Sequence, residues 1–120
     1  MFFLLLVGHA VADFPLQAGP MAAEKCRRSP TYLQRDVPWY YWLTAHAVIH
    51  GGAVYIVTGS LFLALLETAV HWFIDLAKCE GYTNIHVDQL LHVMCKVVWC
   101  LLWANGIPQQ LDPSLVKWLA

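Results

Sequence analysis

Polar residues four positions apart recur in each of the four apolar stretches of this sequence. The stripes are His9, Asp13 and Gln17; His46 and His50; Glu67, His71 and Asp75; and Asp88, His92 and Lys96. A spacing of four places side chains above one another on one face of a helix. Imidazole and carboxylate groups are ligands for zinc, iron and manganese, so the stripes predict metal chemistry.

The predicted metal ligands are histidines and aspartates from all four stretches: His9, Asp13, His46, His71, Asp75 and His92. This set exceeds the four ligands of one tetrahedral zinc ion, so we expect one or two divalent ions, with zinc ahead of manganese or iron. Glu67 lies one turn deeper than His71 on the same face. A buried carboxylate there can serve as the general base toward a metal-bound water, and its alternative role is to hold His71.

Other polar residues are candidates for additional ligands or for supporting positions. Gln17 suits a hydrogen bond to a ligand or to substrate, because an amide is a weaker zinc ligand than a carboxylate. His50 is either a ligand or a hydrogen-bond partner of Glu67 or of a backbone carbonyl. Asp88 is either a ligand or the N-cap of the last helix, with Gln89 in its first turn.

The composition indicates that membrane helices position these stripes. The chain has 120 residues, of which 59% are hydrophobic and 12% charged, outside ordinary soluble usage. We expect one all-α integral membrane domain, a bundle of four transmembrane helices at about 2–17, 39–57, 61–78 and 88–104. A short polar first loop and an interfacial tail from Asn105 complete it. Ionisable groups in such helices cost about 2.5–3.5 kcal/mol each, so the stripes should face inward.

Charge and cysteine usage refine this picture. Basic residues fall in the first loop and at the edges of the second, which predicts that both loops are cytoplasmic. A net charge of −1 without a basic stripe argues against stable nucleic-acid binding. The first stretch resembles a signal peptide but lacks a preceding positive charge, so we expect it to be retained. No Cys-x-x-Cys pair occurs, and we expect all four cysteines to be reduced: Cys26, Cys79, Cys95 and Cys100.

Three runs resemble a family of bacterial and phage membrane proteins, domain of unknown function 3307. They are His9-Ala-Val-Ala-Asp13-Phe-Pro-Leu-Gln17, Glu67-Thr-Ala-Val-His71-Trp-Phe-Ile-Asp75-Leu-Ala-Lys78 and Asp88-Gln89-Leu-Leu-His92. The resemblance covers nearly the whole chain and implies the bacterial inner membrane. That family is similar to predicted membrane-bound metal-dependent hydrolases, which implies hydrolytic potential without a defined reaction. It includes a lysine after the first helix, which makes Lys25 a candidate catalytic residue and Lys78 a similar case.

Two functions from different classes follow. The first is a membrane-embedded metal-dependent hydrolase acting on a phosphoester, a lipid headgroup or a nucleotide, from the cytoplasmic face. Its expected partners are membrane lipids and a small phosphorylated substrate. The second is a non-enzymatic membrane protein, either an ion or proton conduit or a phage accessory factor acting on the host envelope. A conduit needs polar groups through the outer leaflet, where two of the helices are apolar. A soluble metal-containing bundle would have too apolar a surface.

Overall fold

The computed structural model describes residues 1–17, 19–28 and 32–106, and all regular elements in these ranges are helical. They are α1 (Phe2–Asp13), α2 (Gly19–Glu24), the 3-10 helix η1 (Tyr32–Arg35), α3 (Trp39–Thr58), α4 (Leu61–Cys79) and α5 (Ile85–Ala104). The predicted all-α class is confirmed. The predicted interfacial tail lies almost entirely outside the described residues, which end at 106.

Helix α1 is shorter than the predicted segment 2–17. It ends at Asp13, and Phe14 follows with φ −110° and ψ −73°. Pro15 explains the difference, because its ring disfavours a helical residue before it and removes a backbone donor. The amide of Leu16 instead bonds to the carbonyl of Val11 at 3.1 Å. At about 1.5 Å per residue, α1 is roughly 18 Å long.

The first loop contains two short helices, α2 and η1. The last long helix also begins earlier than the predicted residue 88. Asn84 caps it by accepting hydrogen bonds from the amides of His86 and Val87, each at 3.0 Å. The alternative that Asp88 is the N-cap is therefore wrong, and Asp88 lies in the first turn of α5.

A tight turn and a close helix contact align α3 with α4. Gly59 ends α3 with φ 66°, a left-handed conformation that favours glycine, and Ser60 caps α4 through the amide of Leu63. A β-carbon on Gly51 would lie 2.7 Å from the carbonyl oxygen of Ala64. The missing side chain therefore lets the backbones of α3 and α4 approach, and it brings their stripes together.

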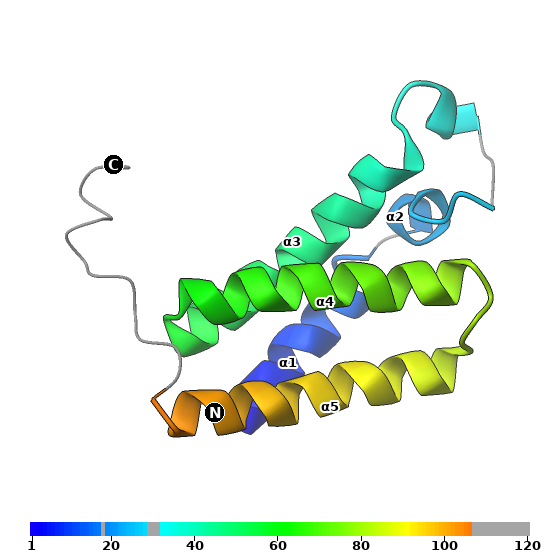
Figure 1. Ribbon diagram of the computed structural model, residues 1–120. Helices are drawn as coiled ribbons and strands as arrows, with labels where there is room; N and C mark the ends of the chain where they lie inside the picture. The colour runs from blue at the N-terminus through cyan, green and yellow to red at the C-terminus, as the bar shows by residue number, and fades with distance from the viewer. Residues whose placement is uncertain (18, 29–31, 107–120) are drawn as a thin grey trace, which may run out of the picture.

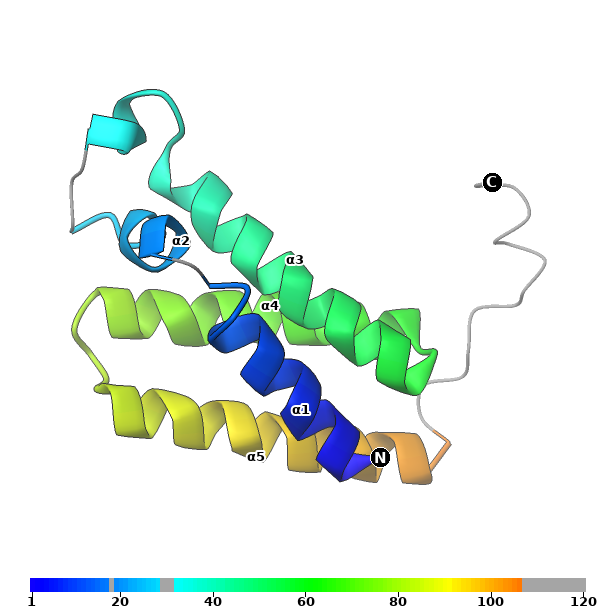
Figure 2. The same ribbon diagram turned by 180° about the vertical axis from the view of Figure 1, so that it is seen from behind.

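The long helices run in alternating directions. Both ribbon views place the start of α1, the α3–α4 turn and the end of α5 at one end, with α2 and the α4–α5 loop at the other (Figures 1 and 2). We call these the turn end and the loop end. An apolar cluster of Leu5, Val54, Leu63 and Trp99 lies toward the turn end.

The distribution of polarity is the reverse of that in a soluble domain. Buried side chains include ten histidines, carboxylates and lysines of the four stripes: His9, Asp13, His46, His50, Glu67, His71, Asp75, Asp88, His92 and Lys96. Large apolar side chains point outward instead, with Ile56 84% and Phe73 66% exposed. Among the described residues, one helix, α5, is long and apolar enough to cross a membrane. The prediction of four spanning helices is therefore not supported.

Candidate metal centre

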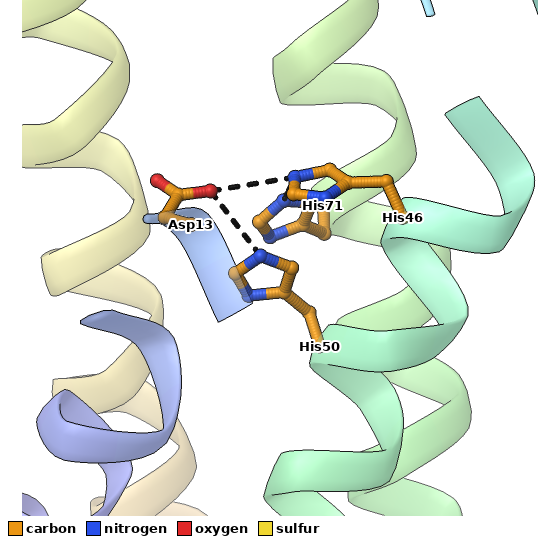
Figure 3. A group of neighbouring side chains, drawn as sticks. All are labelled: Asp13, His46, His50 and His71. Atoms are coloured by element: carbon orange, nitrogen blue, oxygen red, sulfur yellow. Dashed lines mark hydrogen bonds and ion pairs between the residues drawn. The ribbon is translucent and has the colours of Figure 1, made fainter. Parts of the chain in front are cut away.

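Four side chains from three helices form the first candidate group of ligands. Asp13 of α1, His46 and His50 of α3 and His71 of α4 are all buried, and one potential ligand atom from each lies within 4.8 Å of the others. Asp13 Oδ1 is 3.3 Å from His46 Nε2 and 3.2 Å from His50 Nε2. His46 Nε2 is in turn 3.3 Å from His71 Nε2. Figure 3 shows these side chains converging.

These separations fit a tetrahedral cation. Ligand atoms 2.0–2.1 Å from a tetrahedral zinc ion stand roughly 3.3–3.4 Å apart. Asp13 Oδ1 and His50 Nε2 are 3.2 Å apart but are not aligned as a hydrogen bond. A shared ion could therefore satisfy both buried atoms.

A second candidate group shares His71 and adds Asp75 and His92. Asp75 Oδ1 is 3.4 Å from His92 Nε2, while Asp75 Oδ2 is 3.3 Å from His46 Nε2 and 3.8 Å from His71 Nε2. The two oxygens of Asp75 therefore face both groups. The buried groups could hold a metal ion, and five of the six predicted ligands belong to them.

His9, the sixth predicted ligand, lies beside the first group and not within it. Its Nε2 is 3.5 Å from Asp13 Oδ2, and its Nδ1 is 3.4 Å from His50 Nδ1. Gln89 joins the same contacts, because its amide donates to Asp13 Oδ2 at 2.6 Å. His50, by contrast, is a member of the first group.

Charge pairing distinguishes Asp13 from the other carboxylates of the cluster. Lys25 Nζ lies 2.5 Å from Asp75 Oδ2, Lys78 Nζ 2.8 Å from Asp88 Oδ2 and Lys96 Nζ 2.5 Å from Glu67 Oε1. Within the described residues, the ion pairs of Asp13 are with histidines alone: His9, His46 and His50. A buried carboxylate without a cation is costly, and a metal ion would supply the missing charge.

Glu67 makes contacts that suit holding His71. It accepts hydrogen bonds from Lys96 Nζ and from Trp99 Nε1, each at 2.5 Å, and lies 3.3 Å from His71 Nδ1. When a carboxylate accepts from Nδ1, the proton is fixed there and the Nε2 lone pair is free for a metal. That Nε2 faces His46, inside the first group. The general-base role of Glu67 stays a prediction.

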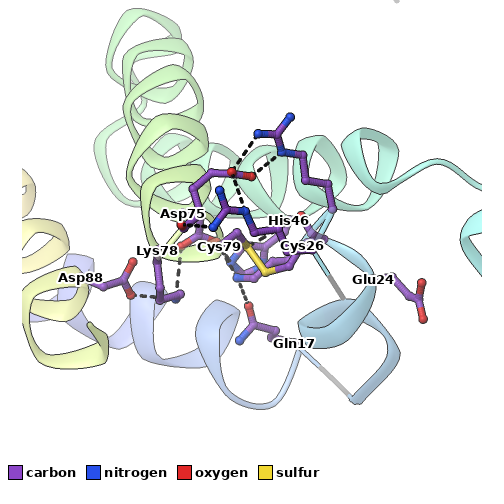
Figure 4. Close-up of a disulfide and its surroundings, with 12 residues drawn as sticks. Gln17, Glu24, Cys26, His46, Asp75, Lys78, Cys79 and Asp88 are labelled. Atoms are coloured by element: carbon purple, nitrogen blue, oxygen red, sulfur yellow. Dashed lines mark hydrogen bonds and ion pairs between the residues drawn. A yellow bond between two sulfur atoms is a disulfide. The ribbon is translucent and has the colours of Figure 1, made fainter. Parts of the chain in front are cut away.

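The loop end brings two lysines to the second group. Lys25, 2% exposed, donates to Asp75 and to Gln17 Oε1, so the residue after α2 reaches α4. Lys78 donates to Asp88 and lies 3.5 Å from Asp75 Oδ1. Figure 4 shows Gln17, Asp75, Lys78 and Asp88 around this end. The ammonium groups are therefore beside the candidate ligands, each paired with a carboxylate.

A disulfide joins Cys26 to Cys79, with Cα atoms 5.0 Å apart (Figure 4). The prediction that these cysteines are reduced is wrong, because the fold brings together two residues that are 53 positions apart. Cys95 and Cys100 are free, as predicted. Beside the bridge, Arg27 bonds to both carboxylate oxygens of Glu80 and holds the pKa of Glu80 below its usual range.

Sequence reasoning missed three features of the site. Lys96 was placed on a stripe but given no role, and Trp99, which was not among the candidate residues, is buried and donates to Glu67. Lys96 and Trp99 are three residues apart, so both lie on one face of the helix. Two hydrogen-bond donors on one apolar face indicate a carboxylate partner on a neighbouring helix. The spacing of Cys26 and Cys79 gave no signal of the disulfide.

Comparisons with known proteins assign a family and no activity. A family model described as Protein of unknown function (DUF3307) matches residues 1–119. No curated protein and no solved structure matches the chain.

Proposed function

The chain belongs to the DUF3307 family, whose function is unknown, and we propose that it is a membrane-embedded metal-dependent hydrolase acting on a phosphoester. The observation that carries the proposal is the pair of buried ligand groups that meet at His71. Four helices contribute to the cluster around them, and a structural role alone would not require so many ionisable groups in one interior.

Zinc is the proposed ion. A donor set of imidazole nitrogens and carboxylate oxygens at tetrahedral spacing suits zinc, and manganese or iron is the alternative. The first group supplies three histidines and one aspartate, and Asp75 with His92 offers a second position adjacent to it. One or two ions are therefore proposed.

The membrane location is supported by the reversed polarity of the bundle. Helix α5 has the length and composition of a span, while α4 is of similar length but carries Glu67, Asp75 and Lys78. Glu67 and Asp75 are buried inside the bundle, so the outer face of α4 remains apolar. Polar groups that satisfy one another inside, with apolar side chains outside, are what a bilayer requires. The resemblance to bacterial membrane proteins supports the inner membrane.

The proposed reaction is addition of water across a phosphoester bond. The water oxygen forms a new bond to phosphorus, the bond from phosphorus to the alcohol oxygen breaks, and the proton lost by water ends on that alcohol. A divalent ion in this position supplies Lewis acidity toward water and phosphoryl oxygens. Lys25 pairs with Asp75 beside this position, and His71 is oriented by Glu67.

A conduit for ions or protons is the alternative function. It is less well supported, because Leu5, Val54 and Leu63 pack together between the polar cluster and the turn end. Stable binding of nucleic acid is also not proposed. Five of the seven basic residues, Lys25, Arg27, Arg28, Lys78 and Lys96, pair with carboxylates, and they form no stripe for phosphates.

Metal content of the detergent-purified full chain tests the proposal. We expect one or two zinc ions per chain, loss of most metal in His71→Ala, and reduced metal in Asp75→Asn. His86→Ala is the matched control, because His86 is exposed and outside both groups. Hydrolysis of bis(p-nitrophenyl) phosphate should disappear with a chelator and return with zinc. A folded wild-type chain that binds no stoichiometric metal would contradict the proposal.

A further inference from the structure

An apolar groove lies between α1 and α3 on the outside of the bundle. It encloses about 470 Å³, within the roughly 300–1,000 Å³ of small-molecule sites. Its walls include Leu4, Val11 and Leu16 on one side and Ile49, Ala53 and Ile56 on the other. The two helices run beside each other in Figure 2. The groove is therefore a lengthwise hydrocarbon surface that faces the proposed lipid.

One end of this groove lies beside the end of α1 that carries Asp13. Ala12 lines the groove and precedes Asp13, a member of the first ligand group; Leu16 lines it and precedes Gln17, which bonds to Lys25. From Leu4 to Ala12 the distance is about 12 Å at 1.5 Å per residue. This is close to the roughly 15 Å of hydrocarbon in one leaflet. A chain in the groove would present its head group at the Asp13 end.

The walls favour an acyl chain over other occupants. All the lining residues are apolar, so an extended peptide segment would leave its backbone N–H and C=O groups without partners in lipid. A nucleotide has no apolar part to fill such a groove. An acyl chain fills it without an unpaired polar group, and the cations of the proposed metal centre, with Lys25 beside Asp75, would complement a phosphate at its head.

We propose that the substrate is a membrane lipid whose acyl chain lies in the groove between α1 and α3 and whose phosphoester reaches Asp13 and Lys25. This assignment rests on the proposed hydrolase function and narrows its substrates from phosphoesters in general to lipids.

Filling the groove tests the assignment. Gly52 lines it, and a β-carbon there would meet nothing within 4 Å, so the side chain of Gly52→Leu starts in open space in the groove. Ala69→Leu is the matched control, an exposed position on α4 outside the groove. Binding of dodecyl phosphate to the full chain in detergent is measured. We expect Gly52→Leu to weaken it by about tenfold or more and Ala69→Leu to leave it unchanged.

Three results would overturn the lipid assignment. They are unchanged affinity in Gly52→Leu, displacement of dodecyl phosphate by glycerol 3-phosphate at equal concentration, and dimers cross-linked through Gly52→Cys, which would place a second copy in the groove. Zinc content of the same samples separates the two proposals. A wild-type chain without zinc would contradict the hydrolase proposal. Binding of dodecyl phosphate tests the assignment of the groove to an acyl chain.

The disulfide carries a separate inference about the orientation of the protein. Cys26 follows α2 and Cys79 ends α4, so the bridge covers the loop end beside Lys25 and Asp75. Disulfides persist in oxidising compartments, whereas the cytosol keeps thiols reduced. The predicted cytoplasmic location of the loops rests on the positive-inside tendency alone, and a covalent bridge is the stronger constraint. We infer that the loop end, with the entrance to the metal centre, faces the oxidising side of the membrane.

Thiol labelling of intact cells tests this orientation. In a Cys95→Ser/Cys100→Ser background, the remaining thiols are Cys26 and Cys79. A membrane-impermeant maleimide should label neither until an impermeant phosphine reductant is added outside, and should then label both. Labelling without reductant would show that the bridge is absent. Labelling that requires permeabilised membranes would place the loops in the cytoplasm. Either result overturns the inference.

Discussion

At the residue scale, Glu67 has the most informative surroundings. Its oxygens accept from Lys96 and Trp99 and face His71 Nδ1, so three of the roughly four lone-pair positions of the carboxylate are occupied. A general base needs a lone pair that is open to water, whereas a carboxylate that orients a metal-ligating histidine does not. The contacts therefore favour an orienting role.

The substitution Glu67→Gln separates these roles. An amide can still contact His71 but no longer carries the charge that holds the Nδ1 proton. We expect the zinc affinity to fall by about 10–100-fold, as for other partners of metal-bound histidines. Competition with a zinc chelator measures it. Trp99→Phe is the milder control, because it removes one donor and keeps the carboxylate. Unchanged affinity with abolished hydrolysis would restore the general-base role.

Sequence spacing located the candidate ligands but not their roles. The repeat of four put His71 under Asp75 and His46 under His50, and these residues do meet in the interior. The spacing does not predict how each helix is rotated about its axis relative to its neighbours. That rotation puts His50 into the first group and His9 beside it, and it is set by packing between helices.

At the element scale, the approach of α3 to α4 determines whether His46 can meet His71. Gly51 permits this approach, because any β-carbon there would press on Thr68 and on the carbonyl oxygen of Ala64. The backbone oxygen cannot rotate away as a side chain could. Neighbouring Gly52 faces open space in the groove.

We therefore expect Gly51→Ala to force α3 and α4 apart. Overpacking of this kind costs about 1–3 kcal/mol of stability. Thermal unfolding in detergent should show a lower midpoint, and zinc affinity should fall with it. Gly52→Ala provides the comparison, since it adds the same atoms on the same helix without a contact. Equal midpoints for the two variants would show that the α3–α4 contact is looser than the structure indicates.

The sequence predicts that α1, α3 and α4 are helices, and it predicts some of their ends. Runs of apolar residues identify α3 and α4 nearly to the residue, because a tight turn at Gly59 separates them. The early end of α1 follows from Pro15, a signal present in the sequence but outweighed by the polar repeat that continues to Gln17. The disulfide depends on how α2 folds back onto α4, which only tertiary structure defines.

At the scale of the whole molecule, many ionisable side chains are buried and many large apolar side chains are exposed. Buried lysines and carboxylates pair inside, while large apolar side chains cover much of the outside. In water such a surface would promote aggregation. In a bilayer it is the expected lipid-facing surface. A charge added to the outer surface should consequently have opposite effects in the two environments.

Phe73→Glu provides that charge on α4, at a side chain that is 66% exposed. In a bilayer, a carboxylate at this position opposes insertion by up to about 2.5–3.5 kcal/mol, so we expect less folded protein in the membrane fraction after alkaline washing. Tyr82→Glu is the control, because Tyr82 is 81% exposed but lies in the loop after α4. It should leave the membrane fraction unchanged. If Phe73→Glu instead increased the yield of soluble, folded, zinc-containing protein, water would be the solvent of this surface, and the metal centre would belong to a soluble bundle.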